Sequence, residues 1–133
     1  GLGTLFLLVT NGIFLGGVAG LYASKGIGTL LLAFVAPHGV LELTAIAIAG
    51  GAGLLLAKAI WMPGARSRRE ALVDEGRRAI TLIACSTIFL IVAGVIEGLV
   101  SPRPDWPLAW KLGVAGATGV VMLAYLLQGK ARA

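Results

Sequence analysis

The sequence predicts an all-α integral membrane protein: a polytopic transmembrane helix bundle with about four spans and a re-entrant half-helix broken at Pro37. The 133 residues are 58% hydrophobic and only 13% charged, whereas soluble domains carry about 45–50% apolar and about 25% charged residues. The apolar residues form long stretches separated by short polar connectors, and a spanning helix needs about 20 such residues. Twenty glycines fit this class, because glycine is more frequent in transmembrane helices than in soluble ones.

The first predicted span covers residues 1–20. Gly12, Gly16 and Gly20 recur at four-residue spacing on one face, and small residues at this spacing let helix backbones approach closely in lipid. Asn11 lies beside this face, and we expect it to hydrogen-bond a neighbouring helix or to cap a local break. A polar connector follows at residues 22–26.

The stretch from residue 27 to residue 60 is too long for one straight span. Its 34 residues would form a helix of about 50 Å, against a hydrocarbon core of about 30 Å. Pro37 removes a backbone donor and Gly39 adds flexibility, so a break is expected there. The sequence therefore predicts a half-helix over 28–36, a turn over 36–39 and a full span over 39–60.

Residues 61–78 form a polar connector rich in arginine, whose second part can make a short helix on the membrane surface. By the positive-inside rule this connector is cytoplasmic. Further spans are expected over 79–100 and 107–127, joined by a proline-rich loop. The basic C-terminal end at 129–132 then also lies in the cytoplasm, which agrees with the first loop.

His38, Glu42 and Glu97 are ionisable groups within apolar stretches. Such groups are expensive in a membrane and by default face a bundle interior, a partner or water. His38 and Glu42 share a helix face if the helix is regular from residue 38 onward. Glu97 lies near the outer end of its span, so the three side chains are expected at similar depth. Gly94 and Gly98 flank Glu97 at four-residue spacing and predict close helix packing there.

Three uses of this polar group remain open. The leading one is a structural hydrogen-bond network between helices. The second is an ion or proton site in a channel or transporter-like unit. The third, with the weakest support, is a metal or hydrolytic site, because one histidine without a second soft ligand is a poor zinc set.

No complete catalytic set, phosphate-binding loop or nucleic-acid module is found in the sequence, so an enzyme is not the expected class and no cofactor is predicted. The net charge of +5 reflects membrane topology rather than nucleic-acid binding. The expected partners are membrane lipids, other membrane or envelope proteins and further copies of the same chain.

Three segments carry a family resemblance: NGIFLGG at 11–17, FVAPHGVLELTAIAIAGGAGLLL at 34–56 and AGVIEGLVSP at 93–102. Together they resemble the stage II sporulation protein M family of integral membrane proteins. The resemblance implies that His38, Glu42 and Glu97 are the polar signature and that Pro37 and Gly39 shape the turn. It also implies a multi-pass protein of a prokaryotic plasma membrane. The namesake is a component of the engulfment machinery that anchors peptidoglycan-degrading enzymes, and what the resemblance transfers to this chain is the membrane bundle and the polar motif. The expected function is therefore a membrane scaffold or a subunit of an envelope-associated complex.

Residues 1–133 are expected to form a single transmembrane domain. The chain starts inside an apolar helix, so we interpret it as a fragment of a longer protein. Members of the family usually carry an upstream cytoplasmic helical part, which agrees with this interpretation.

Overall fold

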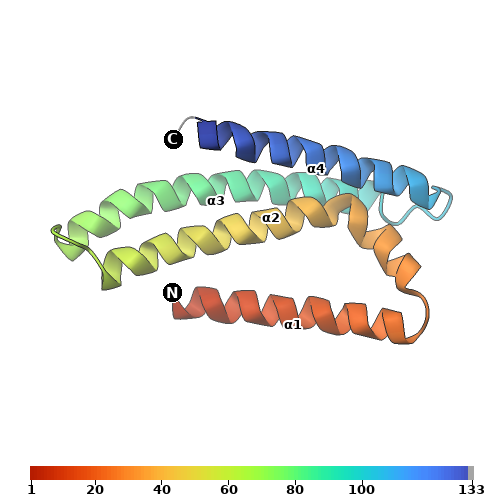
Figure 1. The fold of residues 1–133 in the computed structure, drawn as a ribbon, viewed down its shortest axis with the longest axis horizontal. Coiled ribbons are helices and arrows are strands. Elements are labelled where there is room, and N and C mark those ends of the chain that lie inside the picture. Colours follow the sequence, from red (N-terminus) through yellow and green to blue (C-terminus); the bar gives the residue numbers. More distant parts are fainter. Residues whose placement is uncertain (132–133) are drawn as a thin grey trace. The chain divides into compact units, whose positions relative to one another are not determined.

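The fold is all-helical over the described part of the chain, as the sequence predicts. A computed structural model describes the backbone of residues 1–131 and the side chains of residues 1–127. The four helices, shown in Figure 1, are α1 (Leu2–Ser24), α2 (Gly28–Trp61), α3 (Arg68–Leu99) and α4 (Leu108–Ala131). All four are long and apolar enough to cross a membrane, by length and composition. The prediction of an all-α membrane protein with four spans is therefore confirmed.

The predicted break at Pro37 is wrong in one respect, because α2 stays helical from Gly28 to Trp61 with Pro37 inside it. The helix bends in its orange N-terminal part instead of stopping (Figure 1). Proline removes one hydrogen bond and clashes with the carbonyl four residues earlier, and a kink relieves that clash without ending the helix. Pro37 is also the largest fully buried side chain, so packing around the ring supports the bend. The half-helix over 28–36 is thus the first part of a long bent helix.

The surface helix expected before residue 79 is likewise not separate. Residues from Arg68 onward belong to α3, which continues without interruption to Leu99. A helix of 32 residues is about 48 Å long, against about 30 Å of hydrocarbon. The charged first turns of α3 therefore extend beyond the apolar layer as a continuation of the span. The basic segment expected at 129–132 lies outside the residues whose side chains are described.

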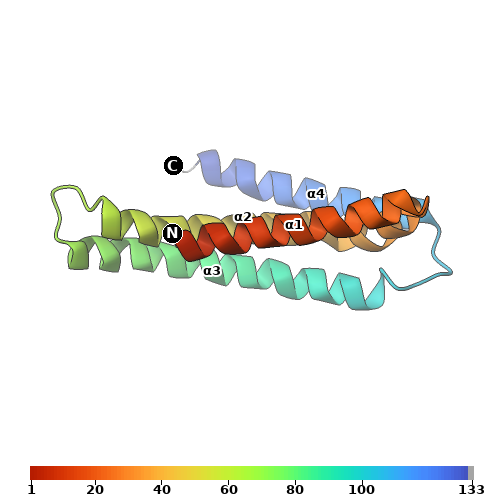
Figure 2. The same cartoon turned by 90° about the horizontal axis from the view of Figure 1, so that it is seen from below.

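The helices contribute to two compact units. Unit 1 comprises residues 1–18 and 44–88, and unit 2 comprises residues 19–43 and 89–133. In unit 1 the yellow half of α2 and the green half of α3 lie side by side in both views (Figure 1; Figure 2). A buried hydrogen bond joins them, since the Ser86 hydroxyl donates to the Ala45 carbonyl at 2.8 Å. An interhelical hydrogen bond of this kind fixes the pairing of two helices that both face lipid elsewhere.

The α1 segment of unit 1 packs against glycines of α2. An ideal Cβ placed on Gly50 would lie 3.1 Å from Leu8 Cδ1, and one placed on Gly53 would overlap the Thr4 side chain. A larger residue at Gly53 would overlap Thr4, whereas at Gly50 the flexible Leu8 side chain would have to shift by a few tenths of an ångström. This is the small-residue packing that the sequence predicts for the protein, found at positions other than those expected.

The core of unit 2 is a small apolar cluster of Leu41, Ala93 and Met122, from α2, α3 and α4 respectively, with Phe89 and Ile96 packed against it. Most other large apolar side chains are exposed on the isolated chain, and none of the α1 residues is buried. A chain of this size in water would not leave so much apolar surface uncovered. This exposure agrees with helices that are apolar enough to cross a membrane.

Candidate functional site

His38 is the most deeply buried ionisable residue of α2. It follows Pro37 directly, so the bend in the helix sets the direction of its side chain. The imidazole is only 3% exposed, and the Phe34 ring meets it edge-on with the ring centroids 5.8 Å apart. Its Nδ1 lies 2.9 Å from the Ser101 hydroxyl. The ring is thus held from one side by an aromatic contact and from the other by a hydrogen bond.

Glu42 and Glu97 complete a three-residue polar cluster with His38. The Nε2 atom of His38 lies 3.9 Å from Glu42 Oε2, which is longer than a hydrogen bond. One ligand atom from each of His38, Glu42 and Glu97 lies within 4.8 Å of the others. The structure therefore brings together the three residues that the sequence singled out, from α2 and α3. Their role stays a prediction.

The two carboxylates differ from the histidine in their surroundings. Glu42 is 37% exposed in its side chain, and Glu97 also lies partly at the surface. Among the described residues, no ion pair to lysine or arginine is found for either acid. Both lie in helices apolar enough to span a membrane, where an unpaired charge is costly. Such a cluster is expected to face water or a covering partner, or to hold a cation or a proton.

Ser101 and Lys111 are site residues that sequence reasoning missed. Lys111, in the first turn of α4, is 6% exposed, and its Nζ donates a hydrogen bond of 2.8 Å to the Ser101 carbonyl. Ser101 thus connects His38 through its hydroxyl and Lys111 through its carbonyl. The signal for Lys111 was present, because it is the one charged residue between 108 and 127. Ser101 lies two residues after the end of α3, and its position beyond a helix end gave no sign of a tertiary contact.

The glycines expected to mediate helix packing face open space within the described part of the chain. A Cβ placed at any of Gly12, Gly16, Gly20, Gly94 and Gly98 meets nothing within 4 Å. The Asn11 amide donates to the Leu7 carbonyl of its own helix at 2.8 Å, and a bond from Asn11 to a neighbouring helix stays a prediction. The glycine stripes are open faces, and packing through them stays a prediction for contacts with other chains.

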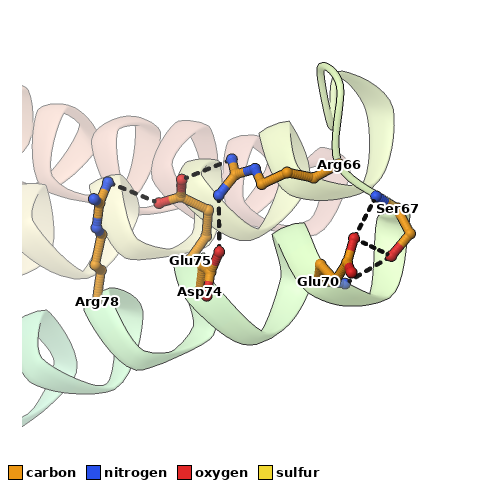
Figure 3. Close-up of polar contacts among 6 residues, drawn as sticks. All are labelled: Arg66, Ser67, Glu70, Asp74, Glu75 and Arg78. Carbon is orange, nitrogen blue, oxygen red and sulfur yellow. Dashed lines mark hydrogen bonds and ion pairs between the residues drawn. The ribbon is translucent and has the colours of Figure 1, made fainter.

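A second polar cluster surrounds the beginning of α3 (Figure 3). The Arg66 guanidinium lies 3.0 Å from Asp74 Oδ2 and 3.6 Å from Glu75 Oε1. Arg78 approaches the other Glu75 oxygen at 3.5 Å. Glu75 is only 7% exposed, so it is a buried acid compensated by two arginines. This arrangement ties the loop before α3 to the helix and gives Glu75 a structural role.

The same cluster contains a capping box at Ser67 and Glu70 (Figure 3). The Glu70 amide donates to Ser67 Oγ at 3.2 Å, and the Ser67 amide donates to Glu70 Oε2 at 2.9 Å. The Ser67 hydroxyl also donates to that carboxylate. These bonds satisfy two amides that a helix start would leave unpaired. Hydrogen bonding from Ser67 lowers the pKa of Glu70, with the nearby Arg66 charge acting in the same direction.

One family model matches the chain over residues 1–102, and its description is Stage II sporulation protein M. The matched part contains the whole of α1, α2 and α3 and the residues His38, Glu42, Glu97 and Ser101. Lys111 and the rest of α4 lie beyond it. No curated protein matches the chain, and no solved structure matches it.

Proposed function

Because the chain belongs to the stage II sporulation protein M family, we propose that it is an integral membrane scaffold or subunit of an envelope-associated protein complex. The observation that carries the proposal is the partial exposure of Glu42 and Glu97 on apolar helices. An acid that faces lipid within a membrane span is costly. A second protein chain covering the cluster removes that cost. The exposed glycine stripe of α1 offers a further surface for close helix contact.

The partners fitting these surfaces are other membrane or envelope proteins and further copies of the chain. By the positive-inside rule, the connector between α2 and α3 lies in the cytoplasm. Labelling a cysteine introduced at Ser67, with Cys85 replaced by alanine, tests this orientation in intact cells. Labelling by a membrane-impermeant reagent from outside would contradict it.

The first experiment is purification from native membranes in a mild detergent, followed by mass spectrometry of whatever stays bound. The proposal expects a partner, or a second copy, in a fixed ratio to the chain. A monomer that retains no protein in several mild detergents and in lipid nanodiscs contradicts it.

A pair of glycine variants makes the experiment specific. Gly12→Leu with Gly16→Leu blocks the glycine stripe of α1 and is expected to release the bound chain. Gly3→Leu is the matched control, because it is also an open glycine on α1 but lies about 140° around the helix from Gly16. Equal retention of the partner in the stripe variant and the control would show that the stripe is not the contact.

A second function, an ion- or proton-conducting unit, is favoured by the meeting of His38, Glu42 and Glu97 beside a bend in α2. Bent or broken helices beside buried ionisable groups occur at transporter binding sites. The test is flux of protons and monovalent cations in liposomes, comparing the native chain with Glu42→Gln and Glu97→Gln. If the native chain shows no flux, or if the native chain and both variants show equal flux, the protein is not a conducting unit that uses these acids.

A further inference from the structure

We propose that His38, Glu42 and Glu97 bind one divalent transition-metal ion, which clasps α2 to α3. The inference goes beyond the proposed function, since it concerns an ion held within one chain. It starts from the donor set. One imidazole nitrogen and two carboxylate oxygens make a mixed set, in which the imidazole favours zinc or iron and the carboxylates favour manganese. The proposed ligand is therefore Zn²⁺, Fe²⁺ or Mn²⁺.

The distances suit a metal after a small adjustment. Metal–ligand bonds of about 2.1 Å place tetrahedral ligands roughly 3.4 Å apart. The pair His38 Nε2 and Glu42 Oε2 is 3.9 Å apart, and the three ligand atoms lie within 4.8 Å. Glutamate side chains have three rotatable bonds, so rotation of Glu42 and Glu97 brings their oxygens inward. His38, the buried member, can stay in place.

The histidine is already arranged as a metal ligand. A metal-binding nitrogen must present a lone pair, so the ring proton has to be on the other nitrogen. In this chain Nδ1 lies 2.9 Å from the Ser101 hydroxyl, whose oxygen can accept a hydrogen bond from Nδ1–H. Nε2, left without a hydrogen bond from the described residues, lies 3.9 Å from a Glu42 carboxylate oxygen, in the cluster that also contains Glu97. A lone pair facing carboxylates is repulsive unless a cation or a proton lies between them.

Charge balance supports a divalent cation. Glu97 has neither a hydrogen bond nor an ion pair among the described residues, and Glu42 has only the long contact to His38. Lys111, the buried cation nearby in the fold, is engaged with the Ser101 carbonyl and makes no ion pair with either acid in the described part of the chain. Two carboxylates and one divalent ion are neutral together, which lowers the cost of the group at membrane depth.

The experiment uses protein purified without a polyhistidine tag and without chelators, since both would disturb the metal content. Elemental analysis is expected to find about one Zn²⁺, Fe²⁺ or Mn²⁺ per chain. After removal of the metal, addition of Zn²⁺ or Mn²⁺ alone is expected to raise the melting temperature in detergent, because an ion that binds only the folded state stabilises it.

Substitutions test whether the metal binds at His38, Glu42 and Glu97. Ser101→Ala, which removes the hydrogen bond behind the ligand, is expected to weaken metal affinity about 10–100-fold, and Glu97→Gln at least as much. Glu97→His supplies an imidazole nitrogen as a metal ligand at this position, and we expect it to bind metal where Glu97→Gln does not. This comparison distinguishes loss of a ligand from loss of the fold. Glu70→Gln is the matched control, an acid of the same helix whose substitution leaves metal affinity unchanged.

Cobalt provides an independent spectroscopic test. Co²⁺ bound to nitrogen and oxygen donors gives visible absorption without the strong near-ultraviolet band of a cobalt–thiolate bond. A thiolate band would assign binding to Cys85, the single cysteine, and would overturn the proposal. The proposal is also overturned if the melting temperature of metal-free protein does not change on addition of Zn²⁺ or Mn²⁺. Equal metal affinity of the native chain and Glu97→Gln would overturn it as well. Partner retention is measured separately, so failure of the metal site and failure of the scaffold proposal are distinguishable.

Discussion

Replacing Gly53 with alanine tests how closely α1 and α2 approach each other. The new Cβ would lie 3.1 Å from Thr4 Cγ2 and 3.2 Å from Thr4 Cβ, and closer still to Thr4 Oγ1. The position of Thr4 Cβ is set by the backbone, so rotation about χ1 cannot relieve this contact and the two helices must move apart. Overpacking of this kind costs about 1–3 kcal/mol.

Gly51→Ala is the matched control in the same helix. Nothing lies within 4 Å of a Cβ at this position, so only the helix propensity changes, which favours alanine by about 0.5–1 kcal/mol. The propensity term is common to both variants and cancels in the comparison. We therefore expect Gly53→Ala to be less stable than Gly51→Ala by about 1–3 kcal/mol.

The assay is unfolding of purified protein in mixed micelles by increasing amounts of denaturing detergent, followed by tryptophan fluorescence. Thr4→Ala combined with Gly53→Ala closes a double-mutant cycle, and a coupling of about 0.5 kcal/mol or more is expected for residues in contact. Equal stability of Gly53→Ala and Gly51→Ala, with no coupling to Thr4, would refute the packing of α1 on α2.

Three further predictions concern single contacts. Ser86→Ala removes a buried hydrogen bond between α2 and α3 and is expected to cost about 0.6–1.7 kcal/mol of stability. Thr87→Ala, the control, loses only a hydrogen bond within α3 and is expected to change stability little. Equal losses of stability in the two variants, measured in the same unfolding assay, would contradict this. Met122→Ala leaves a cavity in the unit 2 core and is expected to cost about 2 kcal/mol or more, and unchanged stability would refute that core. Because the pKa of Glu70 is lowered, its cap on α3 is present above the ordinary value of 4.5 and is lost as the pH falls through the folded-state pKa. Carboxyl ¹³C NMR should show a titration midpoint below 4.5 that rises toward the ordinary value in Ser67→Ala, and a midpoint unaffected by that substitution would rule the cap out.

The secondary structure was largely predictable because it depends on local properties of the chain. Apolar stretches long enough to cross a membrane satisfy their backbone groups only as helices or barrels, and the stretches here correspond to α1 through α4. The errors lie at Pro37 and at Arg68, where the sequence predicts an interruption and the helix continues. Proline lowers helix stability locally, and in this chain the helix continues through a buried proline instead of ending there.

The polar group was only partly predictable. His38, Glu42 and Glu97 stood out because charge in an apolar stretch is costly wherever the helices pack. Ser101 and Lys111 were not identified as partners, since a serine after a helix and a lysine near a helix start are both unremarkable locally. Their contact depends on how α2, α3 and α4 come together in unit 2.

The sequence by itself determined the class of the protein, its spanning helices and the residues too polar for lipid. The cost of exposing backbone and charge to hydrocarbon is a local property and can be summed along the chain. The tertiary structure alone decided which glycines pack: Gly53 of α2 meets Thr4, while Gly12 and Gly16 of α1 face outward. Every glycine has the same capacity for close approach, but the rotation of each helix about its axis selects which ones use it.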